Sequence, residues 1–339
     1  MDRDLTYILP IRSATSQADG ELTPYLCRLA EHAEVIVVDG SPAEVFASHA
    51  AAWGRVVRHL PPAPDLATPM GKVGGVLTGL RHASHERVII ADDDVRYDDA
   101  GLRRVSEALE YAHVARPQNW FSPLPWHARL DSGRMLLNRL VGGDWPGTLG
   151  VRRSALRATN GYDGGAMFEN LELVRTVQAA GGREALLLDT FVERRPSTAR
   201  HFLSQRVRQA YDEIARPARL AFQLAWLPLL VLIAVLWGWA GLVIAALIVM
   251  LLAEAGRRRA GARRYFPASA ALLAPVWMAE RAVCSWLAVC SRLLLGGVRY
   301  RGVVLRTAAT PVRTLRARYA HLRPAQGPPS AAALPRRSA

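Results

Sequence analysis

Short apolar runs alternate with helical patterns through the first two hundred residues. Three of these runs are rich in β-branched or aromatic residues and bounded by polar ones, as buried strands are: Tyr7-Ile8-Leu9-Pro10, Val35-Ile36-Val37-Val38 and Val88-Ile89-Ile90-Ala91. A shorter apolar stretch, Val56-Val57, lies between the last two. Strands that alternate with helices predict an α/β domain with a mixed, mostly parallel sheet.

The pattern changes in the second half, where a long uncharged stretch replaces the alternation. No residue from 220 to 252 is charged. A helix of that length would extend about 50 Å, well beyond the roughly 30 Å hydrocarbon core of a bilayer. Trp237-Gly238-Trp239 places a turn-permissive glycine between two residues that favour membrane interfaces. We therefore expect a transmembrane hairpin over residues 220–254, with short spans near 217–236 and 240–254.

The segments on either side of the hairpin are also expected to contact the membrane. Residues 201–219 predict a basic, interfacial amphipathic helix. Residues 266–297 are apolar but contain Glu280-Arg281, and a charged pair at the bilayer centre is costly. We expect helices that lie in the interface or enter one leaflet; the alternative is a third span with the two side chains paired inside the bundle. Residues 298–339 predict a basic, partly disordered tail.

Charge and cysteine content restrict the partners. The chain has 43 basic and 29 acidic residues, a net charge of +14 and a pI near 10.7. The arginines flank apolar segments and no aromatic-basic binding module is present, which favours anionic lipid headgroups over nucleic acid. Arginines at both ends of the hairpin predict that both ends, and the half of the chain before the hairpin, are cytoplasmic at the inner membrane. The three cysteines form no metal or disulfide pattern, which suits a reducing compartment.

The candidate chemistry begins with Asp92-Asp93-Asp94, directly after the third predicted strand. Carboxylates at the carboxyl end of a strand lie where open α/β sheets bind ligands. Alternate aspartates can converge on one hard cation, which also holds phosphates. Lys72, in a glycine-rich stretch, is the one lysine beside 42 arginines (43 basic residues minus one) and suits a phosphate or base-edge oxygen.

The order of motifs resembles the family 2 glycosyltransferases with the GT-A fold, over roughly residues 7–209. The membrane segment beyond is typical of the ceramide-glucosyltransferase-like and polyprenyl-lipid branches. The resemblance implies a catalytic domain over residues 1–200. The matching pieces are Ile8-Leu9-Pro10, Val37-Val38-Asp39-Gly40-Ser41, Gly71-Lys72, Asp92-Asp93-Asp94, Gly147-Thr148-Leu149-Gly150-Val151-Arg152-Arg153, Asn160-Gly161-Tyr162-Asp163 and Glu169-Asn170-Leu171-Glu172-Leu173.

This resemblance implies roles on the donor side. Pro10 and Lys72 would contact the nucleotide, and Asp39 would accept hydrogen bonds from its base or ribose. Asp92 would face the ribose and the metal, and Asp94 would ligate a Mg²⁺ or Mn²⁺ ion that bridges the donor phosphates. A metal there stabilises the charge that gathers on the departing nucleoside diphosphate. Asp93 would point away.

Two further motifs depart from the family pattern. The family's Gln-x-x-Arg-Trp segment is present as Gln205 and Arg208, which would close over the diphosphate, but Gln209 replaces the tryptophan.

The family's Glu-Asp pair, which supplies the catalytic base, is Glu169-Asn170 here, and asparagine cannot take a proton. Glu169 or Glu172 could substitute, since both would share a helix face. An acceptor that is already an anion, such as a polyprenyl phosphate, would need no base.

Taken together, these features predict an inverting, metal-dependent glycosyltransferase. It would move a sugar from a UDP- or GDP-linked donor to a lipid acceptor at the cytoplasmic leaflet of a membrane with anionic lipids, and it would not bind nucleic acid. The alternatives are a processive polysaccharide synthase and a non-catalytic membrane scaffold that retains a nucleotide pocket. Intact Asp92 and Asp94 argue against the scaffold.

Overall fold

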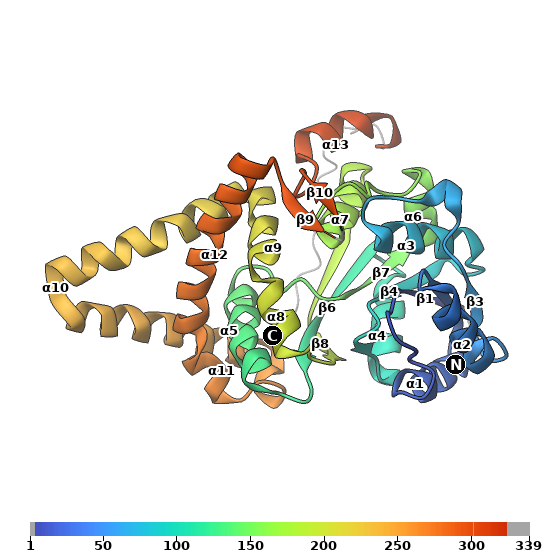
Figure 1. Cartoon of the computed structure of the whole chain (residues 1–339), viewed down its shortest axis with the longest axis horizontal. Helices are drawn as coiled ribbons and strands as arrows, with labels where there is room; N and C mark the ends of the chain where they lie inside the picture. The colour runs from blue at the N-terminus through green and yellow to red at the C-terminus, as the bar shows by residue number, and fades with distance from the viewer. Residues whose placement is uncertain (1–3, 301, 324–339) are drawn as a thin grey trace, which may run out of the picture.

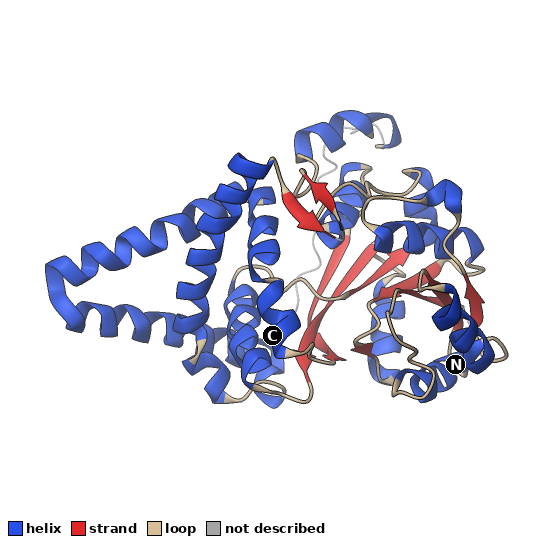
Figure 2. Cartoon of the chain, in the orientation of Figure 1, coloured by secondary structure: helices blue, strands red, loops and turns tan. Residues whose placement is uncertain are grey.

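The computed structural model describes residues 4–300 and 302–323, and its centre is an eight-stranded sheet (Figures 1 and 2). The strand order is β3-β2-β1-β4-β7-β6-β8-β5. β7 is antiparallel to β4 and β6, and β5 is antiparallel to β8, whereas the other neighbours are parallel. The strands are β1 (Leu5–Ile11), β2 (Glu34–Asp39), β3 (Arg58–Leu60), β4 (Arg87–Ala91), β5 (Val95–Arg96), β6 (Val114–Phe121), β7 (Thr148–Arg152) and β8 (Glu184–Arg194). The expected mixed sheet is confirmed.

Helices cover both faces of the sheet (Figure 2). Side chains alternate across a strand, and Ile8 accordingly packs in one apolar layer whereas Tyr7 and Leu9 pack in the other. Strands buried on both faces need continuous apolar runs, which explains the runs seen in the sequence. The helices of this part are α1 (Leu22–Ala30), α2 (Ala43–Trp53), α3 (Gly71–His82), α4 (Asp99–Ala108), α5 (Trp126–Leu140), α6 (Arg153–Ala158) and α7 (Glu169–Ala179), with a 3-10 turn η1 (Pro64–Leu66).

Two glycines let α3 lie unusually close to β1. A Cβ atom on Gly79 would be 2.5 Å from Cγ2 of Ile8, and one on Gly75 would be 2.9 Å from Cβ of Pro10. Real Cβ atoms do not approach so closely, so the helix needs glycine at both positions to pack there. The glycine-rich stretch after Lys72 therefore has a packing reason. Its result is that the N-terminus of α3 lies at the carboxyl end of β1.

The long apolar segment forms α10 (Pro217–Arg258), which folds back on itself at Gly238. Gly238 has φ 60° and ψ −154°, a conformation that is essentially restricted to glycine. Figure 1 shows the two arms as a V whose tip points away from the sheet. The predicted turn at Trp237-Gly238-Trp239 is thus present.

Among the described residues, one helical segment, Pro217–Arg264, is long and apolar enough to cross a membrane, and 11% of its most apolar window is buried. This segment includes both arms and the turn η3 (Arg259–Arg264). No second segment of this kind is found in the described part of residues 266–297. Whether the arms cross a bilayer stays a prediction.

The segments that flank the hairpin pack against the sheet domain. Residues 201–219 do not form the single helix expected; they are divided among α8 (Ala199–Ser204), α9 (Arg206–Tyr211), η2 (Asp212–Ala215) and the start of α10. Residues 266–297 contain α11 (Ala268–Leu272) and α12 (Ala274–Leu295). Glu280 pairs with Arg206 of α9 and not with its neighbour Arg281. The charge of Glu280 is therefore compensated by the domain, which differs from both arrangements expected for this segment.

The chain beyond α12 forms further secondary structure up to residue 322. An antiparallel hairpin, β9 (Val298–Tyr300) and β10 (Val303–Leu305), is followed by α13 (Val312–Arg318) and the turn η4 (Ala320–Leu322). Leu315 and Tyr319 bury against Ala179 of α7. The Pro-, Ala- and Arg-rich end that was expected to be disordered, residues 324–339, lies outside the described residues.

Candidate functional site

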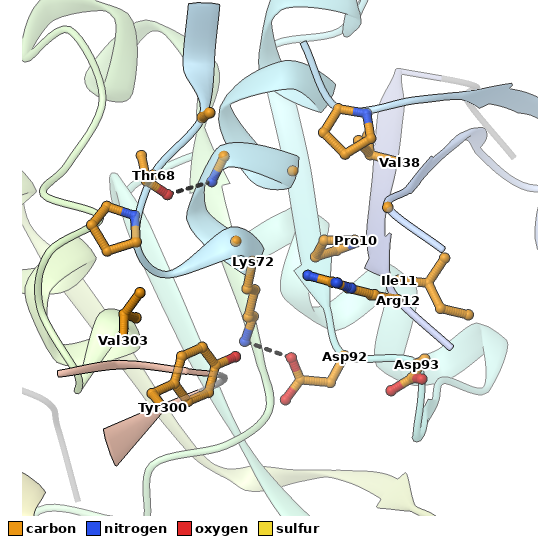
Figure 3. A pocket seen from close by; sticks show the side chains of 17 residues that line it. Pro10, Ile11, Arg12, Val38, Thr68, Lys72, Asp92, Asp93, Tyr300 and Val303 are labelled. Atoms are coloured by element: carbon orange, nitrogen blue, oxygen red, sulfur yellow. Dashed lines mark hydrogen bonds and ion pairs between the residues drawn. The ribbon is translucent and has the colours of Figure 1, made fainter. Parts of the chain in front are cut away.

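A cavity of about 500 Å³ opens at the carboxyl ends of β1, β2 and β4, and we call it the donor cavity. Its wall includes Pro10 from β1, Gly71 and Lys72 from the start of α3, Asp92 from the turn after β4, and Tyr300 from β9 (Figure 3). Two predicted donor residues, Pro10 and Lys72, thus share this cavity with Asp92. Tyr300, which the sequence did not single out, faces the same space.

Lys72 joins two carboxylates at the edge of the donor cavity. Its Nζ lies 2.5 Å from Oδ1 of Asp92 and 2.6 Å from Oε1 of Glu169. Burial disfavours the ammonium, but the two carboxylates outweigh burial and raise the pKa of Lys72. Burial likewise raises the pKa of Glu169, against the opposing effect of Lys72. The one lysine of the chain is therefore a fixed positive charge that holds Asp92 and Glu169 together.

Arg194, at the end of β8, joins the two predicted metal ligands. Its Nε lies 2.9 Å from Oδ2 of Asp94, and its Nη2 lies 3.5 Å from Oδ2 of Asp92. Burial raises the pKa of Asp94 although Arg194 opposes this shift. The second oxygen of Asp94, Oδ1, is buried and has no hydrogen-bond partner among the described residues. An oxygen ligand left free beside a second carboxylate fits a hard divalent cation.

Asp39 is close to the donor cavity but its side chain is fully buried. Val38 and Gly40 line the cavity, whereas Oδ2 of Asp39 lies 2.7 Å from Nδ1 of His49 and 3.0 Å from Nε2 of His59. Burial by itself would raise the pKa of Asp39, but hydrogen bonds from His59, Ser41 and His49 hold it well below its usual range. A contact between Asp39 and the donor base stays a prediction.

These three side chains, Asp39, His49 and His59, are also close enough to be considered as metal ligands. The backbone N–H of Gln17, however, donates to Nε2 of His49 at 2.9 Å. Nδ1 of His49 must then carry the proton that it donates to Asp39. The group is satisfied internally and carries no metal assignment.

The predicted acceptor-side residues are separated by the structure. Glu169 lies in the ion pair with Lys72, whereas Oε2 of Glu172 accepts a hydrogen bond from the backbone N–H of Thr310 at 2.6 Å. Asn170 donates from Nδ2 to the carbonyl oxygen of Pro146 at 3.0 Å. Glu172 and Asn170 therefore hold neighbouring segments in place, and the catalytic roles predicted for Glu169 and Glu172 stay predictions.

Gln205 and Arg208 are also separated. The guanidinium carbon of Arg208 lies 5.1 Å from the ring centroid of Tyr300, on the wall of the donor cavity. Gln205 instead lines a smaller cavity together with Asp94 and Arg194. Arg208 is thus placed next to a residue of the donor cavity, and Gln205 in the wall of a different cavity.

The structure adds two residues that sequence reasoning missed, Arg194 and Tyr300. Arg194 is one of two adjacent arginines in an arginine-rich chain, and nothing in the sequence separates it from Arg195. Tyr300 follows the apolar segments by sequence, and only the fold brings it back to the donor cavity.

No family model matches the sequence, and no curated protein matches it. Among solved structures, the chain is similar to S. aureus TarS 1-349 in complex with UDP-GlcNAc, with 15% identity, 59% of this chain and 61% of that chain covered, and a TM-score of 0.42. It is similar to the mannosyltransferase PcManGT from Pyrobaculum calidifontis in complex with GDP-Man and Mn²⁺, with 16% identity, coverage of 94% and 84%, and a TM-score of 0.46.

The chain is also similar to glucosyl-3-phosphoglycerate synthase from Mycobacterium tuberculosis in complex with Mn²⁺ and UDP-Glc, with 15% identity, coverage of 59% and 74%, and a TM-score of 0.40. It spans less than two thirds of the TarS fragment. The function proposed below rests on the residues of this chain.

Proposed function

We propose that the chain is an inverting glycosyltransferase that moves a sugar from a UDP- or GDP-linked donor to a lipid acceptor at the cytoplasmic face of a membrane. The observation that carries the proposal is that Lys72, Asp92, Asp94 and Arg194 meet at the carboxyl ends of β4 and β8, beside the donor cavity. Alternating carboxylates and fixed cations at this edge of an α/β sheet suit a nucleoside diphosphate and its metal ion.

Each group in and beside the donor cavity has a task in this proposal. The start of α3, where Gly71 and Lys72 line the cavity, would face the diphosphate. Asp92 and Asp94 would hold Mg²⁺ or Mn²⁺, which would stabilise the charge on the departing nucleoside diphosphate. Arg194 pairs with both carboxylates, which fixes their positions, and adds a permanent positive charge. Tyr300 would close the side of the cavity opposite β1.

The membrane part of the proposal rests on α10. Large apolar side chains along both arms are exposed; Val235 is 77% exposed, Trp239 79% and Leu251 68%. Monomeric soluble proteins rarely expose continuous apolar surface on this scale. Arg257, Arg258 and Arg259 follow at the base of the second arm, where anionic headgroups would meet them.

The test is a transfer assay with the purified full-length chain. Vesicles of phosphatidylcholine and phosphatidylglycerol with host lipid extract are incubated with UDP-glucose, UDP-N-acetylglucosamine or GDP-mannose, and products are identified by mass spectrometry. The expected result is one glycosylated lipid, lost after EDTA and restored by Mg²⁺ or Mn²⁺. Nucleotide-sugar binding without turnover would instead support the scaffold, and a polymer would support the processive synthase. No binding of any donor would refute the proposal.

A further inference from the structure

A second cavity, of about 120 Å³, is lined by Asp94, whereas Asp92 and Asp93 line the donor cavity. Arg194 connects the two cavities, because it lines the second and lies 3.5 Å from Asp92, which lines the first. The wall of the second cavity also includes Asp94, His127 at the start of α5, and Gln205. Its volume has room for the reacting end of a molecule rather than for a whole lipid.

His127 lines this cavity, and one of its ring nitrogens is engaged by the backbone. Nε2 of His127 lies 2.8 Å from the carbonyl oxygen of Ser197. A carbonyl can only accept, so Nε2 carries a proton, and in the neutral imidazole Nδ1 is then the nitrogen with the free lone pair. His127 is 6% exposed, and its Nδ1 is buried with no hydrogen-bond partner in the described part of the chain.

Two unsatisfied polar atoms therefore belong to residues of the same small cavity, Nδ1 of His127 and Oδ1 of Asp94. Buried polar atoms are nearly always paired, so each exception calls for an explanation. Both atoms are acceptors. A metal ion explains the oxygen of Asp94, and a hydroxyl that donates its proton explains the nitrogen of His127.

The charges of the second cavity favour a neutral molecule over an anion. Arg194 is paired with Asp94 and Asp92, and Arg134 is paired with Asp131 at 2.8 Å and with Asp144 at 2.5 Å. Both arginines on the wall are thus already compensated. A phosphate placed here would have to compete with buried carboxylates, whereas a hydroxyl would not.

We propose that the second cavity receives the free hydroxyl of a neutral amphiphile and that His127 is the base that removes its proton. This inference rests on the glycosyltransferase function proposed above. The carboxylates expected to do this work are engaged elsewhere, Glu169 with Lys72 and Glu172 with Thr310. Trp126 and Leu203, 58% and 59% exposed on the helices that carry His127 and Phe202, give the apolar part of the amphiphile a surface.

The transfer replaces one bond to the anomeric carbon of the donor sugar with another. The acceptor O–H gives its proton to Nδ1 of His127, and the oxygen lone pair forms the bond to the anomeric carbon of the donor sugar. The bond between that carbon and the diphosphate oxygen breaks, and its electron pair leaves with the nucleoside diphosphate. The imidazolium of His127 then releases the proton to solvent.

The variant His127→Gln shows whether His127 acts as a base or only supports the structure. Glutamine retains an N–H that can donate to Ser197 but has no basic nitrogen. We expect transfer to diacylglycerol in phosphatidylcholine vesicles to fall about 10²–10⁴-fold, the usual contribution of a positioned base. Donor binding and slow donor hydrolysis should persist. His113→Gln, which alters a histidine remote from both cavities, should behave like wild type; it accepts a hydrogen bond from Arg183.

A second variant covers the case in which glutamine disturbs folding. His127→Ala leaves space in the second cavity, and added imidazole should restore transfer in a saturable manner. Wild-type transfer by His127→Gln, or no rescue of His127→Ala in protein that still binds donor, would overturn the role of His127.

The acceptor class has its own test. Vesicles that carry either diacylglycerol or undecaprenyl monophosphate are compared with the same donor. Transfer to diacylglycerol is expected. Transfer to the phosphate alone would overturn this inference and leave the proposed glycosyltransferase standing, whereas absence of donor binding would refute both.

Discussion

Replacement of Lys72 by methionine tests the charge arrangement on which the donor site depends. Methionine retains much of the volume but removes the charge that joins Asp92 and Glu169 at 2.5 and 2.6 Å. The side chains of Lys72, Asp92 and Glu169 are 17%, 24% and 11% exposed, so this group is largely shielded from water. Removal of one partner from a buried ion pair costs roughly 3–5 kcal/mol because a charge is left uncompensated. We expect a loss near the lower end, about 3 kcal/mol at pH 7.

The pH dependence of this loss gives a sharper test than its size. Burial raises the pKa of Glu169 in the folded protein and Lys72 opposes the rise, so the pKa of Glu169 should rise further in Lys72→Met. A carboxyl whose pKa is raised in the folded protein destabilises the fold once the pH exceeds the pKa of that carboxyl in the unfolded chain, about 4.3. The cost grows up to the folded pKa and then stays constant. The deficit of the variant should therefore be largest at neutral pH and shrink on acidification toward pH ~4.

Urea unfolding in detergent, followed by circular dichroism from pH 4 to 8, measures this deficit. Arg81→Met is the matched control, because Arg81 and Asp65 form a 2.7 Å pair whose side chains are 46% and 64% exposed. Its loss should change stability little at any pH. The reasoning fails if Lys72→Met is as stable as this control, or if its deficit does not change with pH. Lys72→Arg should recover part of the stability but not donor binding, since a planar guanidinium does not replace a point charge between two carboxylates.

Three further outcomes are expected. Asp94→Asn should abolish metal-dependent turnover whereas Asp93→Asn, which alters an exposed side chain, should be mild; equal losses in a donor-hydrolysis assay would contradict the separate roles. Asn170→Asp should not raise transfer and should lower the free energy of unfolding by about 1–3 kcal/mol, because a carboxylate cannot donate to Pro146; a more active variant would show that the hydrogen bond is dispensable. Gly238→Ala should cost about 1–3 kcal/mol in detergent, since its backbone angles exclude other residues; unchanged thermal unfolding would argue against the turn.

The predictions from sequence held where local pattern decides the structure. The buried runs at residues 7–10, 35–38 and 88–91 became β1, β2 and β4, because strands buried on both faces require continuous apolar side chains. Gly238 marked the turn of α10 because a single backbone conformation was needed there. The position of Asp92 at a strand end likewise placed it beside Lys72.

The predictions were incomplete where distant segments decide the structure. The short apolar pair Val56-Val57 lies just before β3 and not within it. The helix expected over 201–219 is divided into shorter helices, one of which, α9, packs on α12. The surroundings of Asp39 depend on His49 and His59, which lie 10 and 20 positions later. No period or motif links those histidines to the aspartate. Partners of charged side chains are chosen by the fold, and a list of titratable residues does not reveal them.

The pairing of Arg206 joins α12 to the sheet domain. Arg206 of α9 bonds Glu280 of α12 through Nε at 2.9 Å, and its Nη1 lies 3.1 Å from Asp131 of α5. Asp131 in turn pairs with Arg134, which lines the second cavity. Each of these charged side chains has restricted access to water. Removal of any one of them would leave its partner's charge uncompensated and lower the stability of the fold. These charge pairs, and not apolar contact alone, therefore fix α12 to the wall where the acceptor is proposed to bind. If the proposed function holds, a lipid beside α10 and α12 would meet that wall at a constant distance, and a fixed geometry of this kind favours group transfer.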